Sequence, residues 1–487
     1  MNAPLRRVAV ACLVMFLALL ANLNYVQVVK SQAYRDDGRN ARVLLRAYAR
    51  ERGPIAIGDG RNRMALALSV ATKDRLKYLR TYSAGPEYAP VTGFYSLVYG
   101  RTGIEANQER ILSGEDDRLF VRRLSDLFTG RKPQGGSILL TLSAAAQQAA
   151  WSGLAGKRGA VVALDPRTGA VLAMASAPSY DPGLLSTHDP EAIRKAYTTY
   201  LADPAQPMLN RGINAAYPPG STFKVVTTAA ALAAGYHPDT RIPSPTTLAL
   251  PQTSQPLTNF GGEKCGDGTT STLADALRIS CNTAFGGLGL RLGSGALRKQ
   301  AQAFGFGDSS LRLPTRVSPS VFPDVLSPPQ VAQSAIGQFD VRVTPLQMAL
   351  IASGVANGGD IMSPYLVREV QAPDLSRLDV ATPTVYRHAL DRTVADQLRA
   401  MMELVVSSGT GTAAQIPGVR VAGKTGTAQH APGQPPHAWF IGFAPADNPQ
   451  VAVAVVVENG GSLGSEATGG RLAAPIARDV MRAILGR

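Results

Sequence analysis

The sequence predicts an α+β fold in which an antiparallel sheet, assembled from both ends of one domain, carries helices on its faces. Two apolar segments in the first half, 160–164 and 170–175, predict strands joined by a turn of Asp, Pro, Arg, Thr and Gly residues. Three apolar segments near the C-terminus predict the remaining strands, at 418–423, 437–443 and 451–458. The chain between these groups is helical in pattern, so we expect the early and late strands to meet in one sheet.

Helix-forming patterns occupy most of the chain between the predicted strands. Ser143 precedes an alanine-rich run as an N-cap, and Thr344 stands before Pro345 with Gln347 in the capping-box position. Apolar residues at helical spacing in 393–406 indicate a helix that packs into the core. Together these signals predict helices at 144–154, 221–235, 273–279, 344–357, 393–406 and 473–485.

An apolar segment near the N-terminus, residues 8–29, predicts a membrane-spanning helix. A helix of this length extends about 33 Å, enough to cross a hydrocarbon core of about 30 Å. Arg6 and Arg7 precede it without any acidic residue, so residues 1–7 are expected in the cytoplasm and the rest of the chain outside. The alternative is a cleaved signal peptide, which the poor cleavage site and the continuing apolar character disfavour.

Composition and charge narrow the class of protein. The 487 residues carry a formal net charge of +14, with 45% hydrophobic and 17% charged residues, as in a globular protein. The Lys and Arg residues are scattered, without an arginine-rich helix or an aromatic ladder, so we expect no nucleic-acid partner. A basic surface that faces an anionic membrane or an anionic polymer fits the charge as well.

The first candidate catalytic motif joins Ser221 and Lys224. The Pro-Pro-Gly before Ser221 cannot be helical, so the helix begins at or next to this serine, and Lys224 shares its face one turn on. A desolvated lysine can be neutral and remove the serine proton, which would make Ser221 an acyl-transfer nucleophile. Taken alone, the pair more often marks an N-cap serine and a solvated lysine, so its weight depends on two motifs downstream.

The second motif is Ser280-Cys281-Asn282. A hydroxyl and an amide two residues apart can line one wall of a cleft. Ser280 would pass a proton to a leaving amine, and Asn282 would hold a substrate amide. As a tripeptide this signal is weak, and it gains weight from its place after the first motif.

The third motif is Lys424-Thr425-Gly426-Thr427, at the end of a predicted strand. On a strand Thr425 and Thr427 share one face and Lys424 and Gly426 the other, and the sequence leaves open which face meets the site. Threonine hydroxyls can bind a substrate carboxylate, and a residue as small as Gly426 lets a ligand or backbone approach closely. The backbone N–H of Thr427 can join that of Ser221 as an oxyanion hole.

Residues 418–425 also match the phosphate-loop pattern letter for letter. That loop must lead into a helix whose N-terminus faces phosphate, whereas the segment after Gly426 contains a further glycine and three prolines. We therefore expect no nucleotide site. We also expect no metal and no cofactor, because His430 and His437 lack metal-ligand spacing and further ligands.

Cys265 and Cys281 are the two cysteines outside the apolar N-terminal segment. In an oxidising compartment they can pair, and closing a loop of this size would contribute about 3 kcal/mol on the chain-entropy estimate. Two reduced, partly buried thiols are the alternative, and the sequence does not decide between them.

The three motifs, in this order, resemble the active-site motifs of the penicillin-binding protein and serine β-lactamase superfamily. Stretches at 159–178, 211–223, 335–349 and 407–429 resemble the transpeptidase domain of high-molecular-weight penicillin-binding proteins. The resemblance covers the chain from about residue 140 to the end, with weaker similarity near 52–53 and 95–114. In its length and its N-terminal anchor, the chain most resembles class B penicillin-binding proteins of the actinobacterial penicillin-binding protein A group.

This resemblance implies a domain organisation and a partner. It implies a cytoplasmic tail (1–7), a transmembrane anchor (8–29), a small elongated α+β pedestal (30–140) and a domain with the penicillin-binding transpeptidase fold (141–487). It also implies that the anchor and the pedestal contact a membrane glycosyltransferase of the RodA/FtsW type.

The resemblance further implies a D-Ala-D-Ala transpeptidase that cross-links peptidoglycan stem peptides and is trapped by β-lactams. Lys224 would deprotonate Ser221, and Ser280, helped by Lys424, would protonate the departing D-Ala. Cys281 stands where class A β-lactamases carry an aspartate. The acidic residue that activates the deacylating water in those enzymes has no identifiable counterpart in this sequence, so acylation by penicillin is expected to be long-lived. A D,D-carboxypeptidase, a β-lactamase and a non-catalytic cell-wall-synthesis scaffold are the alternatives.

Overall fold

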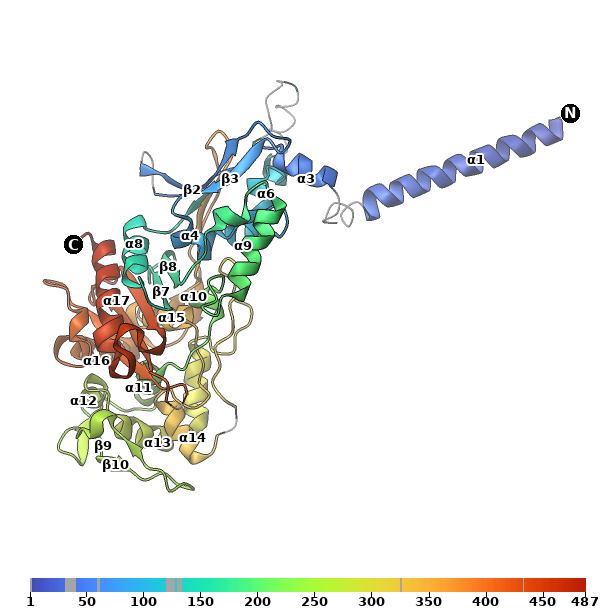
Figure 1. Cartoon of the computed structure of the whole chain (residues 1–487). Coiled ribbons are helices and arrows are strands. Elements are labelled where there is room, and N and C mark those ends of the chain that lie inside the picture. Colours follow the sequence, from blue (N-terminus) through green and yellow to red (C-terminus); the bar gives the residue numbers. More distant parts are fainter. Residues whose placement is uncertain are drawn as a thin grey trace.

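The computed structural model describes residues 2–30, 41–58, 62–119, 128, 134–324, 326–431 and 433–487. Within these residues the chain forms a long N-terminal helix, a smaller region around a six-stranded sheet and a larger region around a five-stranded sheet (Figure 1). Parts of the 30–140 region defined from the sequence lie outside the described residues.

The five-stranded sheet has the order β17-β18-β19-β7-β8, and every neighbouring pair is antiparallel. Its strands are β7 (Gly159–Leu164), β8 (Val171–Ala177), β17 (Ala422–Ala428), β18 (His437–Ala444) and β19 (Val451–Val457). Because β7 pairs with β19, strands from the two ends of this region meet at the centre of the sheet, and the predicted fold is confirmed. The strand expected at 418–423 was wrong in its bounds, because Gly418 turns the chain with a φ of +71° and pairing begins at Ala422.

Helices cover both faces of this sheet, as Figure 1 shows. Helices α8 (Ala144–Gly153) and α17 (Gly469–Leu485) pack together on one face, and α15 (Pro345–Ala356) packs against the other. Every residue of α15 is buried, which explains why the helix is apolar all round. A hydrophobic cluster lies on each side of the sheet, so the strands form the middle layer of a three-layer core.

A further group of helices lies beside the edge strand β17 and beyond it. Helix α11 packs on α13 and α16, and α16 packs on β17. The group comprises α11 (Lys224–Ala233), α12 (Leu273–Arg278), α13 (Asn282–Ala303), α14 (Pro328–Ala335) and α16 (Arg392–Ser408). Short two-stranded sheets flank it: β9 (Arg241–Pro243) with β12 (Thr270–Thr272), β10 (Thr247–Leu248) with β11 (Leu257–Thr258), and β13 (Asp360–Met362) with β16 (Val385–His388).

The six-stranded sheet of the smaller region has the order β15-β14-β6-β1-β2-β3. Its strands are β1 (Ile55–Ile57), β2 (Met64–Ala71), β3 (Tyr78–Tyr82), β6 (Ser137–Leu140), β14 (Val367–Gln371) and β15 (Arg377–Val380). Strands β14 and β15 come from the second half of the chain, and β14 pairs antiparallel with β6. The sheet therefore crosses the division drawn at residue 140 from the sequence. At this junction the backbone N–H of Thr141 donates to the carbonyl of Leu366 at 2.9 Å.

Short helices complete the smaller region and its contact with the larger one. They are α3 (Ala41–Tyr48), α4 (Gly85–Thr92), α5 (Gly103–Asn107) and α6 (Glu109–Leu112), with α9 (Pro190–Ala202) and α10 (Arg211–Asn214) following β8. A two-stranded sheet of β4 (Tyr95–Ser96) and β5 (Gly100–Arg101) connects α4 to α5.

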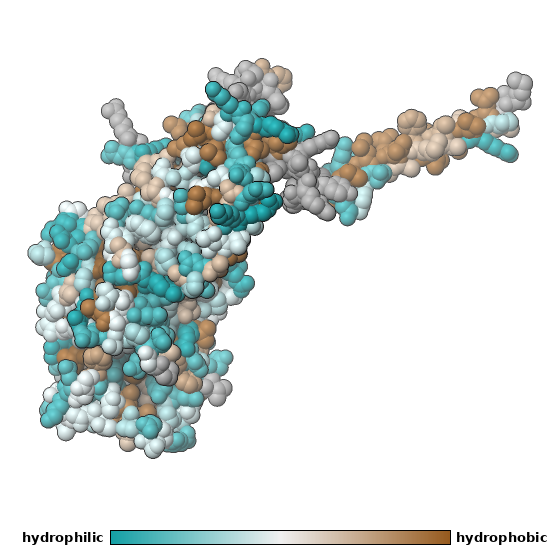
Figure 2. Space-filling view, viewed as in Figure 1, coloured by the Kyte–Doolittle hydropathy of each residue, from teal (hydrophilic) through white to brown (hydrophobic). Residues whose placement is uncertain are grey.

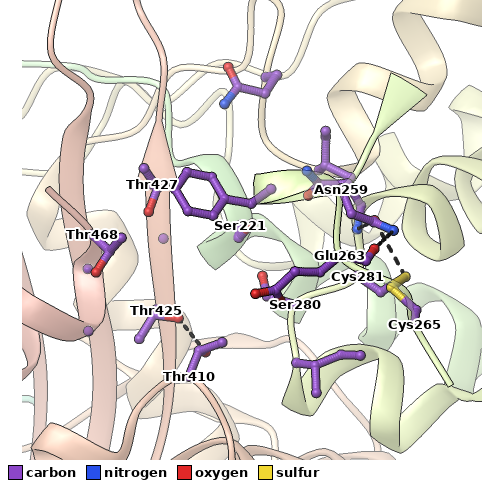
Figure 3. Close-up of a pocket in the computed structure, with 18 of the residues that line it drawn as sticks. Ser221, Asn259, Glu263, Cys265, Ser280, Cys281, Thr410, Thr425, Thr427 and Thr468 are labelled. Carbon is purple, nitrogen blue, oxygen red and sulfur yellow. Dashed lines mark hydrogen bonds between the residues drawn. A yellow bond between two sulfur atoms is a disulfide. The ribbon is translucent and has the colours of Figure 1, made fainter. Parts of the chain in front are cut away.

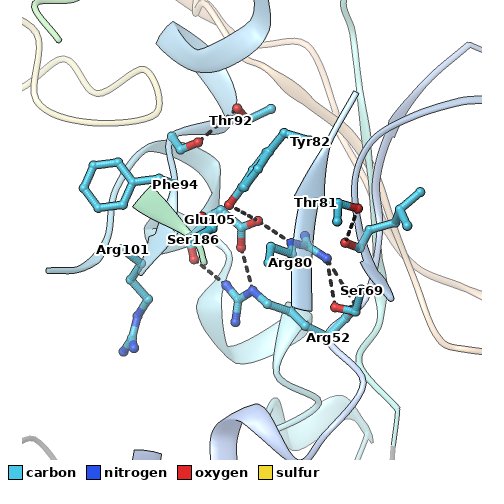
Figure 4. A network of polar contacts seen from close by, with 12 residues as sticks. Arg52, Ser69, Arg80, Thr81, Tyr82, Thr92, Phe94, Arg101, Glu105 and Ser186 are labelled. Carbon is cyan, nitrogen blue, oxygen red and sulfur yellow. Dashed lines mark hydrogen bonds and ion pairs between the residues drawn. The ribbon is translucent and has the colours of Figure 1, made fainter. Parts of the chain in front are cut away.

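A buried ion network holds these elements together (Figure 4). The carboxylate of Glu105, on α5, is fully buried and accepts hydrogen bonds from Arg52 Nε and from Arg80 Nε, each at 2.6 Å. Burial alone would raise the pKa of Glu105, but the two guanidinium groups hold it below its usual value. Arg52 also contacts Glu109 on α6 at 2.6 Å, so one arginine joins two helices to the start of the sheet.

Helix α1 (Asn2–Asn24) continues into a π-helical turn at Tyr25–Val29. The most apolar 18-residue window within Ala3–Val29 has a mean hydropathy of 2.1, and no part of this window is buried. Figure 2 shows hydrophobic side chains along this helix, in contrast to the largely hydrophilic surface of the rest of the chain on the same view. Within the described ranges, this is the one helix long and apolar enough to cross a membrane.

Candidate active site

Ser221 lies in a short 3-10 turn, Gly220–Phe223, that leads directly into α11. The turn follows two prolines and begins with Gly220 in a left-handed conformation, φ +53°. A Cβ at Gly220 would lie 2.8 Å from the carbonyl oxygen of Thr427, so the glycine lets the turn approach β17. The α-helix itself starts at Lys224, three residues later than the sequence suggested, and Gly235 ends it with φ +89°.

The amine of Lys224 lies inside the protein and points to the second motif. Its Nζ donates to the carbonyl oxygen of Ser280 at 2.6 Å and to Asn282 Oδ1 at 2.7 Å, and lies 3.2 Å from Ser280 Oγ. The side chain is completely buried. Burial, and then the nearby charge of Lys424, lower the pKa of Lys224 well below its usual value.

The amine of Lys424 reaches the same serine from the sheet. Its Nζ donates to Ser280 Oγ at 2.9 Å and to the carbonyl oxygen of Thr425 at 2.9 Å. This side chain is also completely buried, and burial lowers the pKa of Lys424 to about 7. Two buried amines whose pKa values are lowered therefore converge on one hydroxyl.

Ser280 is held in an unusual backbone conformation. Its φ is +64°, which non-glycine residues adopt at a cost and which is concentrated at functional sites. Helix α13 begins two residues later, at Asn282, with Cys281 in the N-cap position and no capping bond from that side chain. The conformation thus aims the Ser280 hydroxyl at both lysines while Asn282 starts a helix.

Asn259 supplies the missing cap from a distant loop. Its Oδ1 accepts hydrogen bonds from the backbone N–H groups of Asn282 at 2.9 Å and Thr283 at 3.1 Å, and Asn282 Nδ2 donates to the carbonyl oxygen of Thr258 at 3.2 Å. Asn259 could not be predicted from the sequence, because nothing local links it to a helix that starts 23 residues later.

A disulfide lies in the cavity wall at the second motif. Cys265 and Cys281 are bonded to each other in the structure, and both line the cavity described below. The bond ties the loop that carries Asn259 to the residue between Ser280 and Asn282.

Strand β17 presents the third motif as the opposite wall. Thr425, Gly426 and Thr427 line the cavity, and Thr425 Oγ1 shares a 2.6 Å hydrogen bond with Thr410 Oγ1. A Cβ at Gly426 would lie 2.9 Å from the carbonyl oxygen of Pro219, so the turn before Ser221 packs directly on this glycine. The strand continues to Ala428 without a helix after Lys424, so the local fold is not a phosphate loop.

The three motifs meet in one cavity of about 320 Å³ (Figure 3). Ser221 and Ser280 lie between the wall of β17 and the loop that carries Asn259. Among the described residues, the hydroxyl of Ser221 makes no hydrogen bond, either to Lys224 or to Lys424. The lining residues that the sequence analysis did not single out include Asn259, Phe260, Glu263, Lys264, Ile336, Gln338, Thr410, Thr468, Gly469 and Gly470.

Comparisons with known proteins agree with this architecture. The family model described as the penicillin binding protein transpeptidase domain matches residues 159–482, and the model of the penicillin binding protein A dimerisation domain matches residues 52–138. The chain is 48% identical to the peptidoglycan D,D-transpeptidase PbpA of Mycolicibacterium smegmatis, over 100% of this chain and 99% of that protein. It is 46% identical to the protein of the same name from Mycobacterium tuberculosis, with the same coverage.

A solved structure of a related protein has the same fold as this chain. The ceftriaxone acyl-enzyme complex of penicillin-binding protein A from M. tuberculosis superposes with a TM-score of 0.87 at 46% identity. The match covers 91% of this chain and 100% of that one. By the family models, the full-length relatives and this structure, the chain belongs to the penicillin-binding protein family, in its class B, penicillin-binding protein A group.

Proposed function

We propose that this chain is a peptidoglycan D,D-transpeptidase that cross-links stem peptides through an acyl-enzyme on Ser221, and that β-lactams inhibit it by acylating the same serine. The observation that carries the proposal is the convergence of two buried amines, Lys224 and Lys424, on the hydroxyl of Ser280 in a cavity that Ser221 lines. Relatives that match the whole chain carry the name of this activity, and the similar structure holds a β-lactam acyl-enzyme.

The first step is proton removal from Ser221 by Lys224. A neutral amine has two N–H groups and one lone pair. Donation to the Ser280 carbonyl and to Asn282 Oδ1 uses both N–H groups and leaves the lone pair free to accept from a hydroxyl. The contact between Ser221 and Lys224 forms when substrate is bound, as catalytic hydrogen bonds often tighten only in the complex. Ser221 then attacks the D-Ala-D-Ala carbonyl carbon.

The second step is collapse of the tetrahedral intermediate. The backbone N–H groups of Ser221 and Thr427 stabilise its oxyanion, and the close packing of Gly220 on Thr427 supports this pairing. Ser280, hydrogen-bonded to Lys424, gives its proton to the departing D-Ala amine and recovers one from the lysines. Asn282 holds a substrate amide.

The hydroxyls on β17 recognise the carboxylate at the end of the donor stem. Thr425 and Thr427 line the cavity, and Thr425 is oriented by its 2.6 Å contact with Thr410. Gly426, between them, leaves room for the substrate backbone. A carboxylate accepts several hydrogen bonds at once, so this set suits a D-Ala terminus.

The decisive experiment is covalent labelling of the full chain with fluorescent penicillin. Wild-type protein is expected to take up one label, Ser221→Ala none, and Ser309→Ala, an exposed serine outside the cavity, one. Labelling of Ser221→Ala at the wild-type rate would refute the nucleophile assignment.

Product analysis separates the alternatives that share this chemistry. With a stem-peptide thioester and an acceptor amine, a cross-linked dimer indicates transpeptidation and free acid indicates a carboxypeptidase. Sustained nitrocefin hydrolysis would instead indicate a β-lactamase, and Glu263, an acidic side chain in the cavity wall, is the residue whose Glu263→Gln variant would then slow deacylation. Complementation of a depleted strain by Ser221→Ala would favour a scaffold.

We also propose a location and a partner for the non-catalytic parts. Helix α1 anchors the chain in the cell membrane by a single span, with residues 1–7 in the cytoplasm and the catalytic region (141–487) outside. Its length and hydropathy, and the basic residues Arg6 and Arg7 at its N-terminal end, support this topology. The anchor and residues 30–140 would contact a membrane glycosyltransferase of the RodA/FtsW type. Protease added to intact spheroplasts should digest the large region, and detergent co-purification tests the partner.

A further inference from the structure

A second cavity of about 550 Å³ adjoins the catalytic cavity. The two share three lining residues, Thr410, Thr468 and Gly470, so the second cavity lies directly beside the first. The second cavity is further lined by Thr412, Ala413, Leu463 and Arg471. It is polar, and Arg471 is the one charged residue in its lining as described.

The shared residues lie at the leaving-group end of the proposed reaction. Ser280 protonates the departing amine, and the carboxylate of the departing D-Ala lies at Thr425 and its partner Thr410. Figure 3 places Thr410 and Thr468 on the same side of the cavity as Thr425. The departing D-Ala therefore lies on the side of the catalytic cavity that adjoins the second cavity.

Transfer to the acceptor is the reverse of acylation with a different amine. The acceptor nitrogen bonds to the acyl carbon, the bond from that carbon to Ser221 Oγ breaks, and a proton from the amine passes through Ser280 to Ser221 Oγ. By microscopic reversibility, the attacking amine takes the place that the departing amine left. The remainder of the acceptor must then extend away from Ser280 on that same side.

We propose that the second cavity is the acceptor site, and that Arg471 binds a carboxylate of the acceptor stem peptide. This proposal rests on the proposed function. Arg471 lies in the first turn of α17, next to Thr468, and its side chain is 54% exposed. Its guanidinium contacts Glu466 at 3.4 Å, a long contact to an exposed carboxylate, so an incoming carboxylate can replace it at little cost. Arginine suits this role, because its planar fork binds carboxylates through two parallel hydrogen bonds.

The test measures how much of the acyl-enzyme reacts with an acceptor amine and how much reacts with water. The full chain in detergent is given a donor thioester, and the acceptor is a stem tripeptide with a free side-chain amine and free carboxylates. The same tripeptide with its carboxylates amidated is the second acceptor. Thiol release reports acylation, and the ratio of cross-linked to hydrolysed product reports acceptor use. The variants are Arg471→Gln, the cavity-filling Thr412→Trp, and Arg478→Gln, an arginine on the same helix outside both cavities.

Arg471→Gln is expected to raise the KM for the carboxylate acceptor about tenfold, as for one lost charge-assisted contact. Its KM for the amidated acceptor and its rate of penicillin acylation should stay at the wild-type values. Thr412→Trp should lower the cross-link ratio for both acceptors and leave acylation intact, and Arg478→Gln should behave as wild type. Unchanged acceptor use in Arg471→Gln and Thr412→Trp, with normal acylation, would overturn the acceptor site and leave the proposed function standing. Slower acylation in Thr412→Trp would assign the cavity to the donor and also overturn the proposal. Failure of wild-type acylation would instead remove the proposed function.

Discussion

The amine of Lys424 donates a 2.9 Å hydrogen bond to the hydroxyl of Ser280, although the two residues lie 144 positions apart in the chain. Lys424 belongs to the edge strand β17, and Ser280 stands between α12 and α13. The bond therefore joins the sheet to the helical group beside the cavity. Any change in the charge of this amine alters the acidity of the serine that is proposed to protonate the leaving group.

The rate of penicillin acylation is expected to rise with pH through about 7 and then level off. Burial lowers the pKa of Lys424 to about 7 and places the pKa of Lys224 well below its usual value. A lowered lysine pKa means that the amine loses its proton as the pH rises through that value, so the base form accumulates on the alkaline side. Stopped-flow acylation from pH 5.5 to 9 measures this. A rate that falls as the pH rises across that range would contradict a neutral lysine as the base.

Gly220→Ala is expected to reduce acylation by about a hundredfold or more. The new methyl would meet the carbonyl oxygen of Thr427 at 2.8 Å, and the turn that carries Ser221 would shift away from β17. Gly235→Ala is the matched control: its φ is also positive, +89°, but a Cβ there meets no atom within 4 Å. The control should cost about 1–2 kcal/mol of stability and leave acylation unchanged. Equal acylation rates for the two variants would contradict the proposed contact.

Asn259→Ala is expected to destabilise the protein by about 1–3 kcal/mol and to slow acylation about tenfold. The substitution leaves the backbone N–H groups of Asn282 and Thr283 without an acceptor at the start of α13. Asn282 then loses its fixed position beside Lys224. Asn259→Asp keeps an acceptor oxygen and should retain most of the activity. Thermal unfolding and acylation rates test both variants, and full activity of the alanine variant would show that the cap is dispensable.

Glu105→Gln is expected to lower the free energy of unfolding by about 3–5 kcal/mol without changing the acylation rate of the folded protein. The substitution leaves Arg52 and Arg80, both buried, without their shared carboxylate. Calorimetry measures the loss. Asp117→Asn removes an exposed ion pair with Arg110 and should leave the melting temperature nearly unchanged. A Glu105→Gln variant as stable as wild type would show that the network contributes little.

Local patterns predicted much of the fold, because they report directly on local structure. Prolines and Gly220 placed the turn before α11, Thr344 placed the start of α15, and apolar runs placed β7, β8, β18 and β19. The order of the three motifs indicated the residues that the structure brings into one cavity. These signals depend on residues within a few positions of each other, where sequence and geometry correspond closely.

Such local patterns could not predict contacts between segments that are far apart in the sequence. Nothing in the sequence indicated that Val370 would pair with Ile138, or that Asn259 would cap α13. The left-handed backbone of Ser280 was equally hidden, because serine has no preference for that conformation and only the surrounding packing imposes it. Thr410, which orients Thr425 across 15 residues, was missed for the same reason.

The pairing of β6 with β14 has a mechanical consequence. The chain runs between the two regions along both strands, which lie side by side. The backbone N–H of Thr141, directly after β6, donates to the carbonyl of Leu366, directly before β14. A single connecting strand would let the catalytic region swivel about its backbone bonds, whereas two bonded strands resist twisting. The smaller region is therefore joined to the larger one by paired strands and not by a single linker, which restricts rotation between the two regions.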